Sequence, residues 1–174
     1  ARPVRLAALG DLGPVPGAAA SSAAIDGYED FAVVLRGAGT PTDDNDDERV
    51  LVYYGGSGGP LAGLPVLTLQ RIGPTADLAV TLTPTIGDFD ADGRADLAVL
   101  EAVALDNGTR SDPADDVPIS GRVYLFRNVA GRSGTLPLSS ADVVIDSDTV
   151  TGVLDAITTA PWLHLNADGA SDLA

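Results

Sequence analysis

The sequence predicts an all-β fold made of repeated four-stranded sheets, and three observations support this prediction. The apolar runs are short, rich in Val, Leu and Tyr, and separated by Gly, Pro, Asp and Asn, which is typical of strands and turns rather than helices. Two pairs of landmarks recur at nearly one spacing, because Asp11 and Asp88 lie 77 residues apart and Arg49 and Arg122 lie 73 apart. The 174 residues therefore hold about two and a third repeats of about 75 residues each.

Each repeat contains four expected strands. In the first repeat they are expected near residues 4–10, 30–36, 49–55 and 64–70. In the second repeat they are expected near residues 77–86, 96–103, 121–127 and 142–146, and a third set begins near 153–165 and stops at 172–174. An alternative for the stretch from Ala160 to Leu165, which contains the only Trp, is the start of a helix.

Four antiparallel strands per repeat at this period are typical of the blade of a β-propeller, in which sheets pack face to face around an axis. We therefore divide the chain into a first repeat of residues 1–76, a second of residues 77–152 and the truncated start of a third at 153–174. Together these segments predict a partial propeller, or one that several copies assemble.

Composition excludes several classes of function. The chain has 10 basic and 25 acidic residues, a formal net charge of −15 and no Cys. Disulfide scaffolds, zinc fingers, cysteine nucleophiles and iron–sulfur sites all require cysteine. A strongly negative chain repels phosphate backbones, so we expect no nucleic-acid partner. No stretch approaches the roughly 20 apolar residues that a membrane-spanning helix needs, so we expect no membrane span.

The most informative motif is a short acidic loop in the second repeat. Asp88, Asp90, Asp92 and Asp96 occupy positions 1, 3, 5 and 9 of this loop, and Gly93 occupies position 6. Carboxylates at alternate positions can turn inward around one ion, and Ca²⁺ prefers six to eight oxygen ligands. Glycine at position 6 permits the sharp turn that such a loop requires.

Two interpretations of this loop remain open. In the first, the four aspartates bind Ca²⁺ and Arg94, at position 7, adds its backbone carbonyl. In the second, the segment is a solvated acidic hairpin turn, because Asp-Gly pairs are ordinary turn signals. The full spacing followed at once by an apolar strand is more specific than Asp-Gly alone, and it favours calcium.

The other two repeats contain partial copies of the loop. In the first repeat, a Pro-, Gly-, Ala- and Ser-rich insertion at 13–24 separates Asp11 from Asp26 and Asp30, which converge only if the insertion folds outward. In the third repeat the matching positions hold His164, Asn166, Asp168 and Asp172. Imidazole nitrogen is a poor ligand for a hard cation, so Ca²⁺ there would be weaker or bound without the histidine.

The segment from Gly87 to Val99, followed by Gly121 to Phe126, resembles the FG-GAP or VCBS repeats of propellers like those of integrin α-subunits. This resemblance implies a secreted or cell-surface propeller of six to eight blades, with Ca²⁺ in the loop between the first two strands of a blade. The ligands that it implies here are Asp88, Asp90, Asp92, the Arg94 carbonyl and Asp96. Two and a third blades cannot close a ring, so we expect either a fragment of a longer polypeptide or the association of several copies.

Two longer acidic segments, at 41–48 and 106–116, connect the second and third strands of their repeats. They are expected on the face opposite the calcium loops, where the resemblance places ligand binding; the alternative is that they are solvated loops that confer solubility. The single histidine, His164, is the only candidate imidazole base and aligns with a loop position, so we expect no catalytic residue. The aromatic residues of the strands, Phe31, Tyr53, Tyr54, Tyr124 and Phe126, are expected to pack between sheets, with sugar stacking as the alternative.

The sequence therefore predicts a calcium-binding, non-catalytic propeller module for adhesion or for recognition of a protein or glycan ligand. Two alternatives remain: a non-catalytic part of a secreted carbohydrate-active or other hydrolytic enzyme, and a structural repeat of a surface layer or filament.

Overall fold

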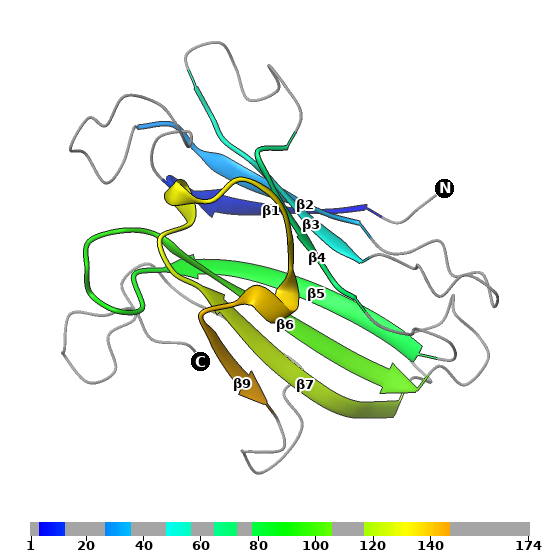
Figure 1. Ribbon diagram of the computed structural model, residues 1–174. Helices are drawn as coiled ribbons and strands as arrows, with labels where there is room; N and C mark the ends of the chain where they lie inside the picture. Colours follow the sequence, from blue (N-terminus) through cyan, green and yellow to red (C-terminus); the bar gives the residue numbers. More distant parts are fainter. Residues whose placement is uncertain are drawn as a thin grey trace.

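A computed structural model describes residues 4–12, 27–35, 48–56, 65–72, 78–105 and 117–146. These residues form two β-sheets and two short 3₁₀ turns and contain no α-helix (Figure 1). An apolar helix long enough to cross a membrane is likewise absent from this part of the chain. The all-β prediction is therefore confirmed at the level of fold class, and the third set of expected strands, at 153–174, lies outside the described residues.

Each sheet contains four consecutive or nearly consecutive antiparallel strands. The first sheet comprises β1 (Val4–Gly10), β2 (Asp30–Leu35), β3 (Arg49–Tyr53) and β4 (Leu67–Gln70). The second comprises β5 (Leu78–Gly87), β6 (Asp96–Leu105), β7 (Val117–Phe126) and β9 (Val143–Asp146). All eight lie within a few residues of the expected strands. The largest difference is at β7, which begins at Val117 rather than near residue 121 because the chain continues through Pro118 with a register shift against β6.

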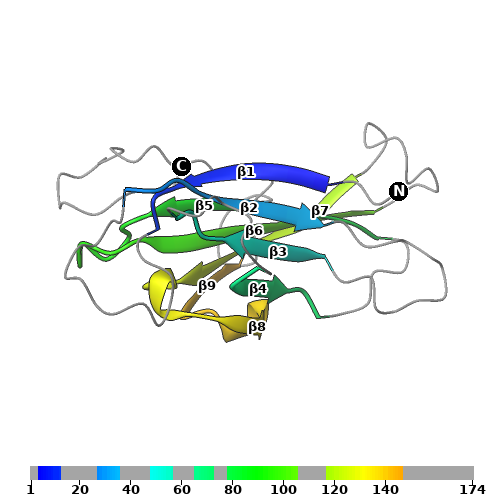
Figure 2. The ribbon, with the colours of Figure 1, turned by 90° about the horizontal axis from the view of Figure 1, so that it is seen from above.

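One further strand was not predicted, and it joins the two sheets. After β7 the chain passes through a 3₁₀ turn, η1 (Val129–Gly131), and forms β8 (Gly134–Pro137), which pairs in parallel with β4 of the first sheet (Figure 2). It then returns through a second turn, η2 (Leu138–Ser140), to β9 in the second sheet. The second repeat thus supplies the fifth strand of the first sheet.

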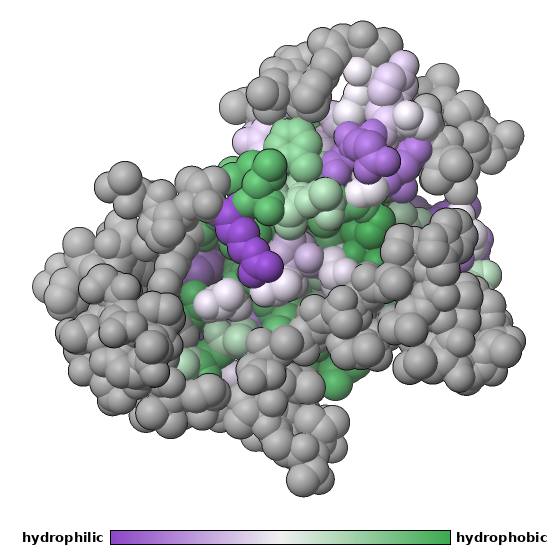
Figure 3. Space-filling view, turned by 180° about the vertical axis from the view of Figure 1, so that it is seen from behind, coloured by the Kyte–Doolittle hydropathy of each residue, from purple (hydrophilic) through white to green (hydrophobic). Residues whose placement is uncertain are grey.

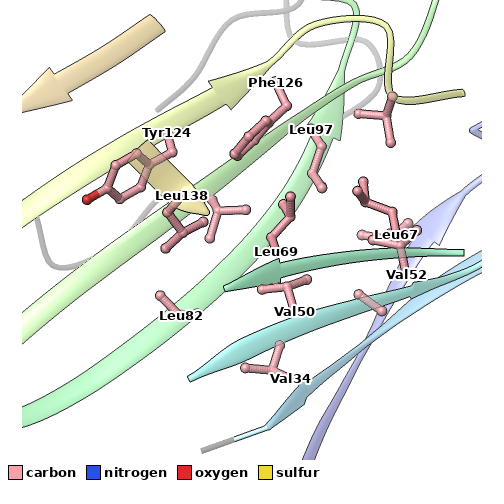
Figure 4. Close-up of a cluster of buried hydrophobic side chains, with 14 of the residues drawn as sticks. Val34, Val50, Val52, Leu67, Leu69, Leu82, Leu97, Tyr124, Phe126 and Leu138 are labelled. Carbon is pink, nitrogen blue, oxygen red and sulfur yellow. The ribbon is translucent and has the colours of Figure 1, made fainter. Parts of the chain in front are cut away.

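The core lies between the two sheets. Side chains from both sheets point toward one another across this interface (Figure 4). Those from the first sheet include Val34, Val50, Val52, Leu67 and Leu69, and those from the second include Leu82, Leu97, Tyr124 and Phe126. Val129 and Leu138, from the segment around β8, complete the same cluster, and the Tyr54 hydroxyl donates to the Val129 carbonyl at 3.1 Å. Tyr54, Tyr124 and Phe126 therefore pack between the sheets as expected, whereas Phe31 and Tyr53 stack on each other and do not belong to this cluster.

A polar contact also connects the sheets. Arg71, just after β4, donates from Nε to Glu101 Oε1 on β6 at 2.9 Å, and both side chains are nearly buried. The Tyr124 hydroxyl donates to the second oxygen of Glu101 at 2.8 Å. Because both carboxylate oxygens have partners, the buried charge is compensated and fixes the relative position of the sheets at this end.

The core is formed by opposite faces of the two equivalent sheets. A two-fold axis between the sheets would instead bring the same face of each into the core. Asp30 and Asp96 are the equivalent first residues of β2 and β6. Two residues after Asp30, Ala32 points into the shared core, but two residues after Asp96, Ala98 lies in a separate cluster on the far face of the second sheet. Side chains alternate along a strand, so opposite faces of equivalent sheets meet in the core. Such packing is heterologous, and it either closes into a ring or continues as a stack.

Leu138→Ala tests the contribution of the segment that joins the sheets. Leu138 is 2% exposed, so the substitution should leave a cavity and lower the free energy of unfolding by about 2–5 kcal/mol. Urea denaturation should show this loss, whereas Ser139→Ala, at the exposed neighbouring position, should change stability by less than about 0.5 kcal/mol. Equal stabilities for the two variants would show that the segment does not belong to the core.

Candidate metal centre

The loop between β5 and β6 brings three carboxylates together. One oxygen from each of Asp88, Asp90 and Asp96 lies within 4.8 Å of the others. These residues are half-buried, exposed and buried, respectively. Three negative charges at this separation repel by about 1 kcal/mol per pair in water, and by several times more at the effective dielectric constant of a protein surface. A divalent cation would remove this repulsion, and carboxylate oxygens suit Ca²⁺ or Mg²⁺.

Asp96 connects this loop to the sheet. Its carboxylate is fully buried and accepts the backbone N–H of Phe89 at 3.0 Å and that of Asn128 at 2.7 Å. Burial raises the pKa of Asp96 above its ordinary value, the two N–H donors act in the opposite direction, and the charges of Asp90 and Asp92 raise it further. Each Asp96 oxygen accepts one N–H and has a second lone pair available for a cation.

Hydrogen bonds from the backbone close the rest of the loop. Asp88 accepts the N–H of Asp92 on Oδ1 at 3.0 Å and that of Gly93 on Oδ2 at 2.9 Å. Gly93 has a φ of 81°, in the left-handed region that glycine tolerates, and Ala91 has a φ of 59°. A left-handed alanine costs about 1–2 kcal/mol, so the bonds from the following residues to Asp88 offset local strain.

The two other loop residues predicted as ligands lie beside this group. Asp92 is exposed, is not one of the three clustered carboxylates, and accepts the N–H of Arg94 on Oδ1 at 2.9 Å. Arg94 is also exposed. The structure therefore brings together positions 1, 3 and 9 of the predicted site, and Asp92 instead accepts a backbone bond within its own loop.

A basic side chain from the next turn approaches the cluster. This residue is Arg127, which directly follows β7. Its Nε atom lies 3.5 Å from Asp90 Oδ2. Its backbone N–H donates to Asp142 Oδ2 at 2.7 Å, and Asp142 also pairs with Arg132. The acidic loop therefore contacts the start of the segment that crosses between the sheets.

The first repeat makes the same backbone contacts to its aspartates despite its insertion, although among the described residues only Asp88, Asp90 and Asp96 form a carboxylate cluster. Asp30 is 2% exposed and accepts the N–H of Leu12 and that of Gly55, both at 2.6 Å. Asp11 accepts the N–H of Gly27 at 2.6 Å, and Gly27 has a φ of 84°. These contacts match those of Asp96 and Asp88 in the second repeat, so the insertion leaves the ends of the loop in register.

Gly55 and Asn128 are the site residues that the motif did not identify. Both follow the third strand of their sheet, and both donate a backbone N–H to the buried aspartate. A Cβ on Gly55 would lie 2.6 Å from the Glu29 carbonyl oxygen, so a side chain would not fit there. Asn128 has a φ of 50°. The 73-residue spacing of their segments, already visible in the sequence, was the signal that could have paired them.

The remaining predicted ligands lie outside the described residues. These are Asp26 of the first loop and, in the third repeat, Asn166, Asp168 and Asp172, together with His164 at the leading position. The acidic segments at 41–47 and 106–116 lie outside them as well.

Comparison with known proteins identified no relative of the chain. No protein-family model, curated protein or solved structure matches the chain.

Asp96→Asn separates the structural role of this residue from any role in binding a cation. An amide has one acceptor oxygen, so one of the two backbone N–H groups loses its partner, and the metal-free protein should lose about 1–3 kcal/mol of unfolding free energy. Thermal and urea denaturation in EDTA would measure this loss. Asp92→Asn, which removes the same charge at an exposed position, should change the same quantity by less than about 0.5 kcal/mol. Similar losses in the two variants would contradict the anchoring role of Asp96.

Proposed function

We propose that the chain is a calcium-stabilised, non-catalytic recognition module of an extracellular propeller-type repeat protein. The observation that carries this proposal is the convergence of Asp88, Asp90 and Asp96 in a loop with the spacing of a calcium site. The resemblance of the same loop to FG-GAP or VCBS repeats supports it.

The stacking of the sheets supports the propeller part of the proposal. Successive repeats that meet through opposite faces are the arrangement that a ring of blades requires. In addition, the middle strands are apolar on both faces, as Phe31–Leu35 and Leu97–Leu100 illustrate. A sheet with one face in water would alternate between apolar and polar residues.

Calcium would have a structural role at this centre. Asp88, Asp90 and Asp96 would hold it, and a bound cation would neutralise their mutual repulsion. Because Asp96 also binds the turn after β7, the ion would stabilise the junction between the acidic loop and the second sheet. Binding to the folded state alone adds to folding stability.

The end of the sheets away from the acidic loop offers a place for a ligand. A cavity of about 240 Å³ there is lined by charged and small polar side chains rather than by a reactive pair. Its lining residues are Arg71, Glu101, Val103, Ser120, Gly121, Arg122 and Asp146. Fixed acid and base pairs, such as Arg122 Nε with Asp146 at 2.7 Å, suit the hydroxyl and carboxylate groups of glycans or acidic peptides.

The calcium proposal is tested by thermal melting with EDTA and with added Ca²⁺. At a calcium concentration about 100 times the dissociation constant, stability should rise by about 2.7 kcal/mol, which corresponds to about 5–10 °C in Tm. Asp88→Ala and Asp90→Ala should reduce this increase, whereas Asp43→Ala, with the same charge change in the separate acidic segment, should retain it. An unchanged Tm in all conditions would rule out the calcium centre.

Recognition is tested separately with glycan arrays and acidic peptides in the presence of calcium. We expect binding without product release, and Arg122→Gln should weaken the binding about tenfold by removing one charged hydrogen-bond donor. Arg5→Gln, which changes the charge equally on β1, should not. Turnover of a bound glycan would favour the enzyme alternative, and regular self-assembly without ligand binding would favour the surface-layer alternative.

A further inference from the structure

β4 and β9 are equivalent strands, but among the described residues only β4 has a neighbour on its outer side. Each is the fourth antiparallel strand of its sheet and pairs with the third. The 73-residue spacing aligns Val50 with Val123, and these two residues pair with Leu69 and Ile145, respectively. β8 lies in parallel along the outer edge of β4, whereas β9 is the outermost described strand of the second sheet (Figure 1).

The two strands differ in exposure at equivalent positions. Leu67 and Leu69 of β4 are fully buried. On β9, Ile145 is 37% exposed and the neighbouring Val144 is 46% exposed. Natural proteins commonly protect an edge strand with charge, with proline or with a covering segment, because its backbone groups can pair with another chain. The outer edge of β9 therefore resembles the edge of β4 without its covering strand.

The backbone before β9 repeats the geometry that receives β8. Val66 and Asp142 each lie in a bend that directly precedes their strand. The N–H of Val66 donates to the Val52 carbonyl on β3 at 3.0 Å, and the carbonyl of Val66 accepts the N–H of Gly134 at 2.8 Å. The N–H of Asp142 donates to the Leu125 carbonyl on β7 at 2.9 Å, which is the equivalent of the first bond. The Asp142 carbonyl therefore occupies the position to which the first N–H of an added strand donates.

Exposed apolar side chains alone would not identify this edge. Leu6 is 68% exposed and Ile72 is 76% exposed at other places on the chain. Seen from behind, apolar side chains also lie beside polar ones between the grey segments (Figure 3). β9 differs from these places because the structure contains, at the equivalent edge, the segment that pairs there. That segment, Gly134–Pro137, is uncharged, and its Leu136 is aligned with Leu69 of β4.

We propose that the outer edge of β9 binds an extended, uncharged peptide strand of the β8 type in the parallel direction. The register of β8 on β4 places the incoming leucine beside Ile145 and the residue before it beside Val144. Main-chain hydrogen bonds supply affinity, and the leucine supplies specificity. A chain with a formal charge of −15 repels an acidic strand. Because the equivalence of the two sheets involves no cation, the strand should bind both in EDTA and in calcium.

NMR titration of the full isotope-labelled chain with a synthetic peptide tests this proposal. The peptide has the sequence of residues 133–138 and blocked ends. Because only a short strand pairs, we expect a dissociation constant of roughly 0.1–1 mM. The changes in amide chemical shift should be concentrated at residues 143–146. A spin label at the N-terminus of the peptide should broaden the amide signal of Val143 more than that of Asp146, because parallel pairing places this end beside Val143.

Substitutions in both partners separate docking from folding. A peptide with Leu136→Asp should cause no shift changes at the same concentration, and this substitution leaves the protein itself intact. In the chain, Ile145→Lys and Val144→Lys should abolish the shift changes, because each places a charge beside the apolar strand. Val144 is exposed, so Val144→Lys should keep the wild-type Tm. Ile72→Lys makes the matched change at an exposed position outside β9, and it should bind the peptide like the wild type.

Four results would overturn the proposal. The first is the absence of shift changes at residues 143–146 with several millimolar peptide. The second is equal binding of the Leu136→Asp peptide, because the contact would then be unspecific. The third is stronger broadening of Asp146 than of Val143, because the strand would then run antiparallel. The fourth is an equal loss of binding in Ile72→Lys, because the effect would then be one of overall charge.

Discussion

A buried carboxylate that accepts two backbone N–H groups is the interaction on which both described sheets depend. Asp96 receives one N–H from the acidic loop and one from the turn after the third strand of its sheet, and Asp30 does the same in the first sheet. A buried charge without such donors would destabilise the fold by several kcal/mol. The same residue therefore begins the second strand, fixes the turn beyond the third, and orients the loop in which Asp88 and Asp90 meet it.

This arrangement explains how the first repeat accommodates an insertion. Its loop is interrupted after Leu12, yet Asp11 and Asp30 keep the contacts that Asp88 and Asp96 make. The contacts involve the two ends of the loop, whose backbone groups are held by the buried aspartate and by glycine in the left-handed region. Residues between the ends are free to vary in number, because loop length adds to the cost of closure only slowly.

Much of the fold was predictable from the sequence, and the exceptions have a common cause. Strand positions follow from local apolar runs and turn residues, and eight strands were placed within a few residues. β8 was missed because its partner, β4, lies in the other repeat, and no local pattern encodes a parallel pairing across such a distance. In the site, spacing predicted the convergence of Asp88, Asp90 and Asp96, but it did not reveal that Asp92 accepts a bond from Arg94 instead. The roles of Gly55 and Asn128 depend on backbone N–H groups, which no residue pattern displays.

The path of β8 also determines when the first repeat can be complete during synthesis. A chain leaves the ribosome from its N-terminus, so β1 to β4 emerge long before residues 134–137. Until then the outer edge of β4 has unpaired backbone groups, and such an edge is available to other nascent chains. The last step in closing the first sheet therefore depends on the second having been made. The first two repeats are consequently expected to fold together as one cooperative unit and not as two independent domains.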